Sequence, residues 1–145
     1  MANAESLLNL ESDQVAVEKF LKENDGHLMR DEANPALYWL SMRPRSAPSE
    51  RYHVRVLWTS YPDAAPSILF SDGVGGALGV MHAWPVIPGY RPPNDICKPF
   101  TAEGFSLHAE WQSGPDAWPT DGNPFVWVAE VLQNDLNTHY TGRAG

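Results

Sequence analysis

The chain has 145 residues, a length that suits one domain and allows a core that buries roughly two thirds of the unfolded surface. Hydrophobic residues make up 43% and charged residues only 19% of the sequence, which excludes a chain that is disordered throughout. Ten basic against eighteen acidic residues give a net charge of −8, and Lys and Arg form no cluster, so we expect no nucleic-acid partner.

We expect no targeting signal at the start of the chain and no membrane-spanning segment. Residues 1–11 lack a basic stretch followed by a long apolar one, and no later segment approaches about 18 consecutive apolar residues. We therefore expect a soluble, cytoplasmic protein without membrane contact. It should form a single domain over residues 1–145, with flexible ends at 1–12 and 141–145.

The first predicted element is an amphipathic helix over residues 13–24. Gly26 stands where such a helix would end, and three apolar residues share one helical face: Val17, Phe20 and Leu21. The preceding segment, residues 7–10, either extends this helix or crosses the core as a short lead-in.

Three predicted strands follow the helix. Residues 36–42 form an aromatic-rich apolar run that ends before Pro44, and residues 52–58 alternate strictly between the two faces of a strand. A third strand is expected over residues 66–70. Since short turns separate these runs, we expect an antiparallel meander.

The rest of the chain divides into a loop-rich segment and a final helix. Residues 71–122 are rich in Pro, Gly and aromatic residues, which favours a segment that is ordered and packed. The helix should start with Asn123 as its N-cap and Pro124 at its first position, and it should end near His139. Its apolar stripe consists of Phe125, Val128, Leu132 and Leu136.

Cys97 is the one cysteine in the sequence. It can form no intramolecular disulfide and no thiolate-rich metal site, and the sequence predicts no metal and no cofactor. Three interpretations stay open: a small buried apolar side chain, a thiol for intermolecular pairing, or a nucleophile.

A resemblance to a known family starts in the strand over residues 52–58. This strand runs into Tyr61-Pro62 and then, through Pro66, into another strand, which is similar to a segment of the ubiquitin-conjugating enzymes. In that family an ordered loop then leads to the thioester cysteine, and Pro93-Asn-Asp-Ile-Cys97 resembles this position. A later Trp and a helix that begins near a Pro are matched by Trp111, Trp118 and Asn123-Pro124.

The resemblance implies an α/β (α+β) fold of the ubiquitin-conjugating type: an N-terminal helix, an antiparallel meander, a cysteine-bearing loop and a C-terminal helix. It implies that Cys97 carries a ubiquitin-like modifier as a thioester. An adenylating enzyme would supply the modifier, and a target amine would receive it. The His-Pro-Asn tripeptide of the family is missing, and the stretches before and after Cys97 differ in length. These departures point to divergent bacterial relatives, some of which belong to antiphage systems.

Two further residues are candidates for assisting Cys97. Asn94 is loosely comparable with the family's Asn as an oxyanion or loop-stabilising amide, although a turn residue is the simpler interpretation. His108 is preferred over His82 as a general base or loop latch, against the simpler interpretation of an imidazole bound to a backbone carbonyl. Asp95 should disfavour the thiolate while helping an incoming lysine, and Lys98 should do the opposite.

Other functions find less support. The main alternative is a non-catalytic protein-binding module on the same fold, as in RWD-type relatives, and a third is an unrelated hydrolase or ligand-binding domain. His108-Ala-Glu110 lacks the Pro-Cys-x-x-Cys of zinc deaminases, and the glycines of residues 73–79 precede no helical pattern of the kind that dinucleotide-binding loops require.

Overall fold

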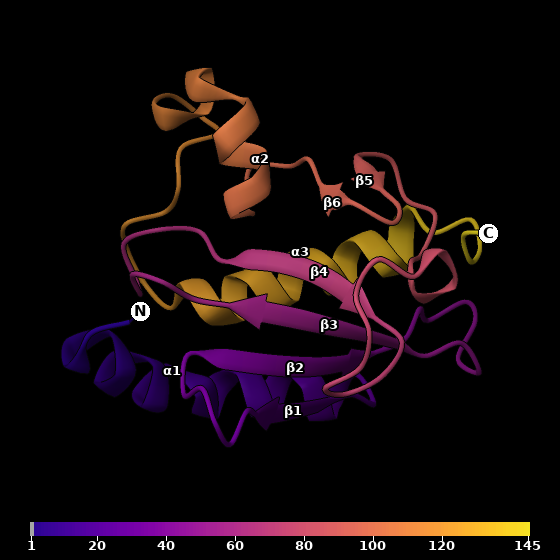
Figure 1. Cartoon of the computed structure of the whole chain (residues 1–145), viewed down its shortest axis with the longest axis horizontal. Helices are drawn as coiled ribbons and strands as arrows, with labels where there is room; N and C mark the ends of the chain where they lie inside the picture. The colour runs from indigo at the N-terminus through magenta and orange to yellow at the C-terminus, as the bar shows by residue number, and fades with distance from the viewer. Residues whose placement is uncertain (1) are drawn as a thin grey trace.

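The computed structural model describes residues 2–145. It is a mixed α/β fold in which an N-terminal helix, a four-stranded antiparallel sheet and a C-terminal helix form the main body (Figure 1). The elements of this body are α1 (Ala4–Glu23), β1 (His27–Arg30), β2 (Leu37–Met42), β3 (Tyr52–Leu57), β4 (Ser67–Ser71) and α3 (Pro124–Thr138).

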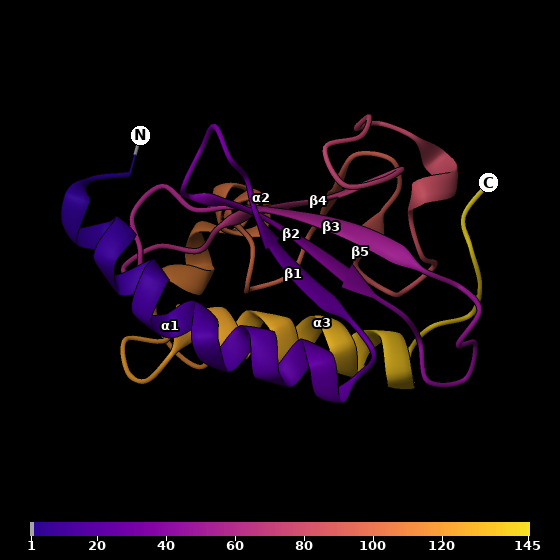
Figure 2. The same ribbon diagram turned by 90° about the horizontal axis from the view of Figure 1, so that it is seen from below.

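The strands follow one another in the order β1-β2-β3-β4, so the sheet is a simple meander. In β3 the side chains alternate between buried and partly exposed, because one face of the sheet is covered by helices and the other is not. Figure 2 shows α1 and α3 side by side on the covered face, and the two helices contact each other along their length.

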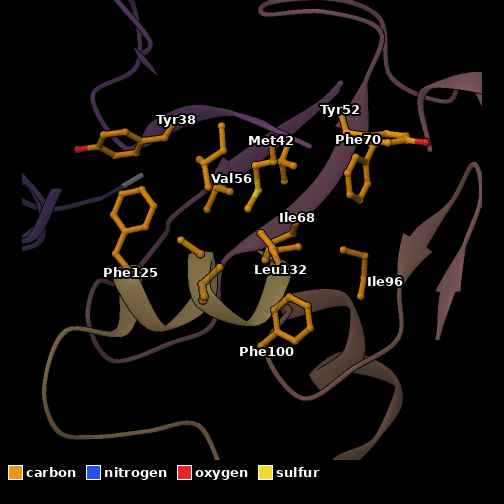
Figure 3. Packing of buried hydrophobic residues seen from close by; sticks show 14 of the residues in the cluster. Tyr38, Met42, Tyr52, Val56, Ile68, Phe70, Ile96, Phe100, Phe125 and Leu132 are labelled. Atoms are coloured by element: carbon orange, nitrogen blue, oxygen red, sulfur yellow. The ribbon is translucent and has the colours of Figure 1, made fainter. Parts of the chain in front are cut away.

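The core lies between this sheet and the two helices. Leu10 and Val17 of α1, Val56 of β3 and Leu132 of α3 are almost fully buried. Figure 3 shows Phe125 beneath Tyr38 and Leu132 beneath Met42 and Val56. Aromatic rings fill the end of the core near the β3–β4 loop, where Trp58 packs edge-on against Tyr61, Phe125 and Trp118.

The sequence predicted three of the four strands and missed β1. The predicted runs 36–42, 52–58 and 66–70 correspond to β2, β3 and β4. β1 is only 4 residues long, and its sequence His-Leu-Met-Arg has no strong apolar alternation. It forms because it pairs antiparallel with β2, with Leu28 opposite Leu40, which is a long-range effect that no local pattern reveals.

Of the two long helices, α1 begins earlier than the sequence predicted and α3 lies where it was predicted. α1 begins at Ala4, where the Asn3 side chain accepts a hydrogen bond from the Ser6 N–H at 2.8 Å. Residues 4–12, expected to be flexible, are thus part of α1, with Leu10 fully buried. The boundaries of α3 are confirmed, since Asn123 caps it by accepting from the Val126 N–H at 3.0 Å.

The loop-rich segment contains short elements that the sequence did not indicate. These are η1 (Met81–Ala83), β5 (Tyr90–Arg91), β6 (Asp95–Ile96), α2 (Ala102–Leu107) and η2 (Ala109–Gln112). Trp84, Tyr90 and Phe100 are buried against the main body, as expected for a packed segment. The end of the chain, also expected to be flexible, lies along this segment, where Ala144 N–H donates to the Trp84 carbonyl at 2.9 Å.

Candidate active site

Cys97 lies directly after β6, at the start of the turn that leads into α2. Its side chain is partly exposed, and its backbone N–H donates to the Gly89 carbonyl at 2.8 Å. The residues around it are anchored in the core: Ile96 is fully buried and Phe100 is 2% exposed. Figure 3 shows both side chains on the core side of this segment, with Phe100 below Leu132. Cys97 is therefore a partly exposed residue on a backbone that is fixed on both sides.

The turn after Cys97 is held closed by Thr101, which is fully buried. Its hydroxyl donates to the Ile96 carbonyl at 2.6 Å and accepts from the Gly104 N–H at 2.9 Å, so that it also caps α2. A Cβ on Gly104 would stand 2.2 Å from the Lys98 carbonyl oxygen, which no real contact allows. The sequence thus needs glycine at this position for α2 to approach the cysteine turn so closely.

α2 is also tied to the sheet. Glu103 accepts hydrogen bonds from the Ser67 hydroxyl at 2.5 Å and the Ile68 N–H at 3.1 Å, both in β4. In addition, Ala102 N–H donates to the Pro66 carbonyl at 2.8 Å. These bonds fix the start of α2, and with it the turn that carries Cys97, to the edge of the sheet.

A buried carboxylate lies beneath the cysteine turn. Asp135 of α3 is almost fully buried, accepts from the Tyr90 hydroxyl at 2.8 Å and forms an ion pair with Lys98, whose Nζ is 3.2 Å from both carboxylate oxygens. Burial, together with the adjacent Asp135 charge, raises the pKa of Tyr90 well above its usual value. This cluster of Tyr90, Lys98 and Asp135, which we call the anchor cluster, joins both sides of the β5–β6 hairpin to α3.

Sequence reasoning missed the anchor cluster. The available signal was Asp135 itself, because it lies between Leu132 and Leu136 on the apolar stripe of the predicted helix. A charged residue at such a position needs a partner of opposite charge. Its partner, Lys98, is 37 residues away in the sequence, so the pairing was invisible before the fold was known.

Opposite charges also lie on the exposed side of Cys97. Arg91 and Asp95 face each other across the β5–β6 hairpin and form a bidentate ion pair, with N–O distances of 2.7 and 2.8 Å. Side chains two positions apart on an extended strand share a face, which places Asp95 on the side of Cys97. The pKa of Arg91 is raised mainly by Asp95 and to a smaller degree by the charge of a Cys97 thiolate.

The structure does not bring Asn94 close to Cys97. Asn94 is exposed at the tip of the hairpin, where its N–H donates to the Arg91 carbonyl at 2.8 Å. Cys97 lies at the base of the hairpin, and three residues of extended chain span about 10 Å. Asn94 therefore has the position of a turn residue.

His108 is carried away from Cys97 by α2, which rises from the sheet in Figure 1. It follows the last residue of α2, stacks on Trp111 with ring centroids 4.1 Å apart, and places Nδ1 2.8 Å from a Glu110 carboxylate oxygen. His82 contacts the carbonyl of Ala144 at 3.2 Å. Among the hydrogen bonds of residues 2–145, none joins either imidazole to Cys97.

A groove of about 520 Å³ opens on the other side of α2. It lies between the β3–β4 loop and the segment that follows η2, and its walls are mainly apolar. The residues that shape it include Ala64, Ala65, Phe105, Ala117 and Trp118. The Trp118 ring is fixed in this wall because its indole N–H donates to the Pro62 carbonyl at 2.8 Å.

A metal site of three ligands and a membrane-spanning helix are both absent from residues 2–145. No three His, Cys, Asp or Glu side chains come together there in a way that would hold a metal ion, and none of the helices has the length and apolar character needed to cross a bilayer. Comparison of the chain with family models, with curated proteins and with solved structures finds no match.

Proposed function

We propose that this protein carries a ubiquitin-like modifier as a thioester on Cys97 and transfers it to an amine of a target protein. The observation that carries the proposal is the position of Cys97: the residue is partly exposed, while its turn is held by Gly89, Thr101 and the anchor cluster. A cysteine that served only as core filler would be buried.

The order of elements supports the same proposal. A helix, a four-stranded antiparallel meander, a cysteine turn and a closing helix follow one another as they do in the ubiquitin-conjugating enzymes that the sequence resembles. Because some bacterial relatives of that family belong to antiphage systems, we extend the proposal to a conjugation system of that kind.

The proposed reaction has two acyl transfers. First, the Cys97 thiolate attacks the thioester that links the modifier to its adenylating enzyme, a new C–S bond forms, and the enzyme's thiolate leaves. Next, the target amine attacks the carbonyl carbon, a C–N bond forms, and the C–S bond breaks with its electron pair on the Cys97 sulfur. The proton that the nitrogen loses balances this charge. The chain itself contributes a fixed, partly exposed cysteine and the Arg91–Asp95 charges beside it.

The test is the intact mass of the protein after incubation with ATP, a ubiquitin-like protein and the adenylating enzyme that charges it. We expect an adduct of the modifier's mass that thiol reductant removes, that Cys97→Ala abolishes and that becomes resistant to reductant in Cys97→Lys. Asn94→Ala and His108→Ala serve as matched controls in the same segment and should keep the adduct. If the modifier charges its activating enzyme but never Cys97, the proposal is wrong.

The apolar groove beside α2 favours a second candidate, a non-catalytic protein-binding module. It is open, and its size suits an apolar side chain or short segment of a partner. This candidate predicts that a partner protein co-purifies equally well with the native protein and with Cys97→Ala, and that Trp118→Ala releases it. Phe105→Leu, which keeps the groove apolar, is the control.

A further inference from the structure

A second concave site, which Cys97 does not line, lies at the end of the sheet where β3 begins and β4 ends. It is an open pocket of about 170 Å³ between the end of β4, the start of β3, η1 and the C-terminal tail. Its polar walls are formed by Arg51, His53, Ser71, Asp72, His82 and Arg143, which we call the basic pocket. None of its walls belongs to the cysteine turn or the anchor cluster.

The charge of this pocket runs against the charge of the chain. In a protein with a net charge of −8, two guanidinium groups and two imidazoles line it beside one carboxylate. That carboxylate, Asp72, accepts from the Ala77 N–H at 2.7 Å and so fixes the loop after β4. The groups turned to the pocket are therefore mainly hydrogen-bond donors.

Arg51 carries a charge without a counter-ion. It donates to the Ser41 hydroxyl at 2.7 Å and to the Asp25 carbonyl at 3.3 Å, both neutral oxygens, and no carboxylate among residues 2–145 pairs with it. Arg143 is fixed above the Tyr52 ring at 4.2 Å, donates to the His82 and Arg51 carbonyls, and pairs with the Glu50 carboxylate at 3.1 Å, so Arg51 is the guanidinium whose charge is left for a ligand. Both guanidinium groups are thus held in place by the fold before any ligand arrives.

His53 lines the pocket together with the two arginines and adds an imidazole to it. It projects from the outer face of β3 between Ser41 and Ser71, and its Nδ1 is buried without a hydrogen-bond partner among residues 2–145. Burial, followed by the charges of Arg51 and Arg143, lowers the pKa of His53, while Asp72 opposes this effect weakly. Because Nδ1 is shielded from solvent, the ring offers its other nitrogen, Nε2, which has no hydrogen-bond partner among residues 2–145 and is not buried, as the contact for a ligand in the pocket.

The size of the pocket limits the ligand. A water molecule takes about 30 Å³ in the liquid, so a pocket of about 170 Å³ holds the equivalent of a few water molecules. That is room for one small oxyanion and little more. Sites for drug-sized ligands begin at about 300 Å³, which excludes a whole nucleotide. Arginine forks match the paired oxygens of carboxylate and phosphate alike, but a phosphoryl group offers three acceptor oxygens and the larger negative charge to this mainly cationic lining.

We propose that the basic pocket binds a single phosphoryl group, with Arg51 as its main charge partner and His53 as a second contact. This site is separate from Cys97 and does not depend on the proposed acyl transfer. The phosphoryl group can come from inorganic phosphate or from a small phosphomonoester, because both present the same three oxygens to the arginines.

The test is an NMR titration of the histidine ring signals with inorganic phosphate and, in a second arm, with phenyl phosphate. We expect saturable shifts of the His53 and His82 signals, with sodium chloride at equal ionic strength giving none. Shifts with phosphate alone identify the free anion as the ligand, and shifts with both identify an open phosphomonoester site.

Three arginine variants sharpen this test. Arg51→Gln should weaken phosphate binding about tenfold, and Arg51→Lys, which keeps the charge but loses the fork, should weaken it less. Arg55→Gln removes a guanidinium from β3, outside the pocket, so its effect should stay within about twofold. Equal effects of Arg51→Gln and Arg55→Gln, or identical shifts with chloride, would overturn the proposal.

Discussion

The body of the protein and its cysteine turn are stabilised by different forces. In the body, the sheet and the helices α1 and α3 bury apolar and aromatic side chains against one another. In the turn, residues 96–104, Ile96 and Phe100 reach into the same core, but polar contacts close the turn: the Thr101 hydroxyl, the Lys98–Asp135 ion pair and the Glu103 bonds to β4. Apolar packing tolerates small shifts, whereas a few directional bonds fix one geometry. A local change should therefore move Cys97 without unfolding the body.

The largest expected effect lies in the body. Phe125 is fully buried and packs against the rings of Tyr38 and Trp58, so Phe125→Ala removes contacts at the centre of the core. We expect the free energy of unfolding to fall by about 3–5 kcal/mol in urea titrations. Leu107→Ala, at a site that is 55% exposed, is the control and should cost less than about 0.5 kcal/mol. Equal losses would contradict an apolar core centred on Phe125.

The next effect lies in the turn, at Gly104. A Cβ would meet the backbone oxygen of Lys98 at 2.2 Å, and backbone yields less easily than a side chain. The higher helix propensity of alanine offsets up to about 1 kcal/mol, so we expect Gly104→Ala to cost a net of about 1–3 kcal/mol. The rate at which iodoacetamide alkylates Cys97 in the folded protein should change as well.

Gly73 offers the matched control for this variant, since a Cβ added there meets nothing within 4 Å. Gly73→Ala should leave both the free energy of unfolding and the alkylation rate of Cys97 unchanged within error. If Gly104→Ala behaved in the same way, α2 would not be holding the cysteine turn as described.

A smaller effect is expected from the anchor cluster. Lys98→Met keeps the length of the side chain but leaves the buried Asp135 with Tyr90 as its one partner. Because the Lys98 side chain is 28% exposed and its charge is partly screened, we expect a loss of about 1–2 kcal/mol. Adding Asp135→Leu should recover most of the stability, since the pair is then replaced by apolar contacts.

The double variant also separates the effect of the anchor cluster on the stability of the fold from its effect on the position of Cys97. If the anchor cluster positions Cys97, the double variant regains stability in urea but keeps an altered alkylation rate. Arg91→Met breaks an exposed ion pair in the same hairpin and should cost less than Lys98→Met. A double variant that restored both readouts would show that the cluster acts on stability alone.

The contrast between body and turn also explains what the sequence could predict. β2, β3, β4 and α3 carry their own signals, in alternation, an N-cap and a proline at the first helical position. The presence of Cys97 in a turn was predictable from its flanking prolines. The anchor cluster was not, because its partners are far apart in the sequence. His108 was chosen as a partner for Cys97 because it lies in an aromatic-flanked segment after the cysteine, but α2 separates the two residues.

The smallest expected effect is the pH dependence of stability that comes from His53, a polar residue on the outer face of the sheet. Burial and the nearby arginines lower the pKa of His53 in the folded protein below its ordinary value of 6.5. The unfolded chain then binds more protons than the folded one once the pH falls below about 6.5. The stability of the folded state is therefore complete above that pH and declines as the pH falls toward the folded-state pKa.

Urea titrations between about pH 7.5 and 5.5 should show this decline, and His53→Gln should reduce it. His27→Gln, at an exposed position of β1, should leave it intact. A decline of equal size in all three proteins would assign it to other groups, and the outer face of the sheet would then add nothing to the pH dependence.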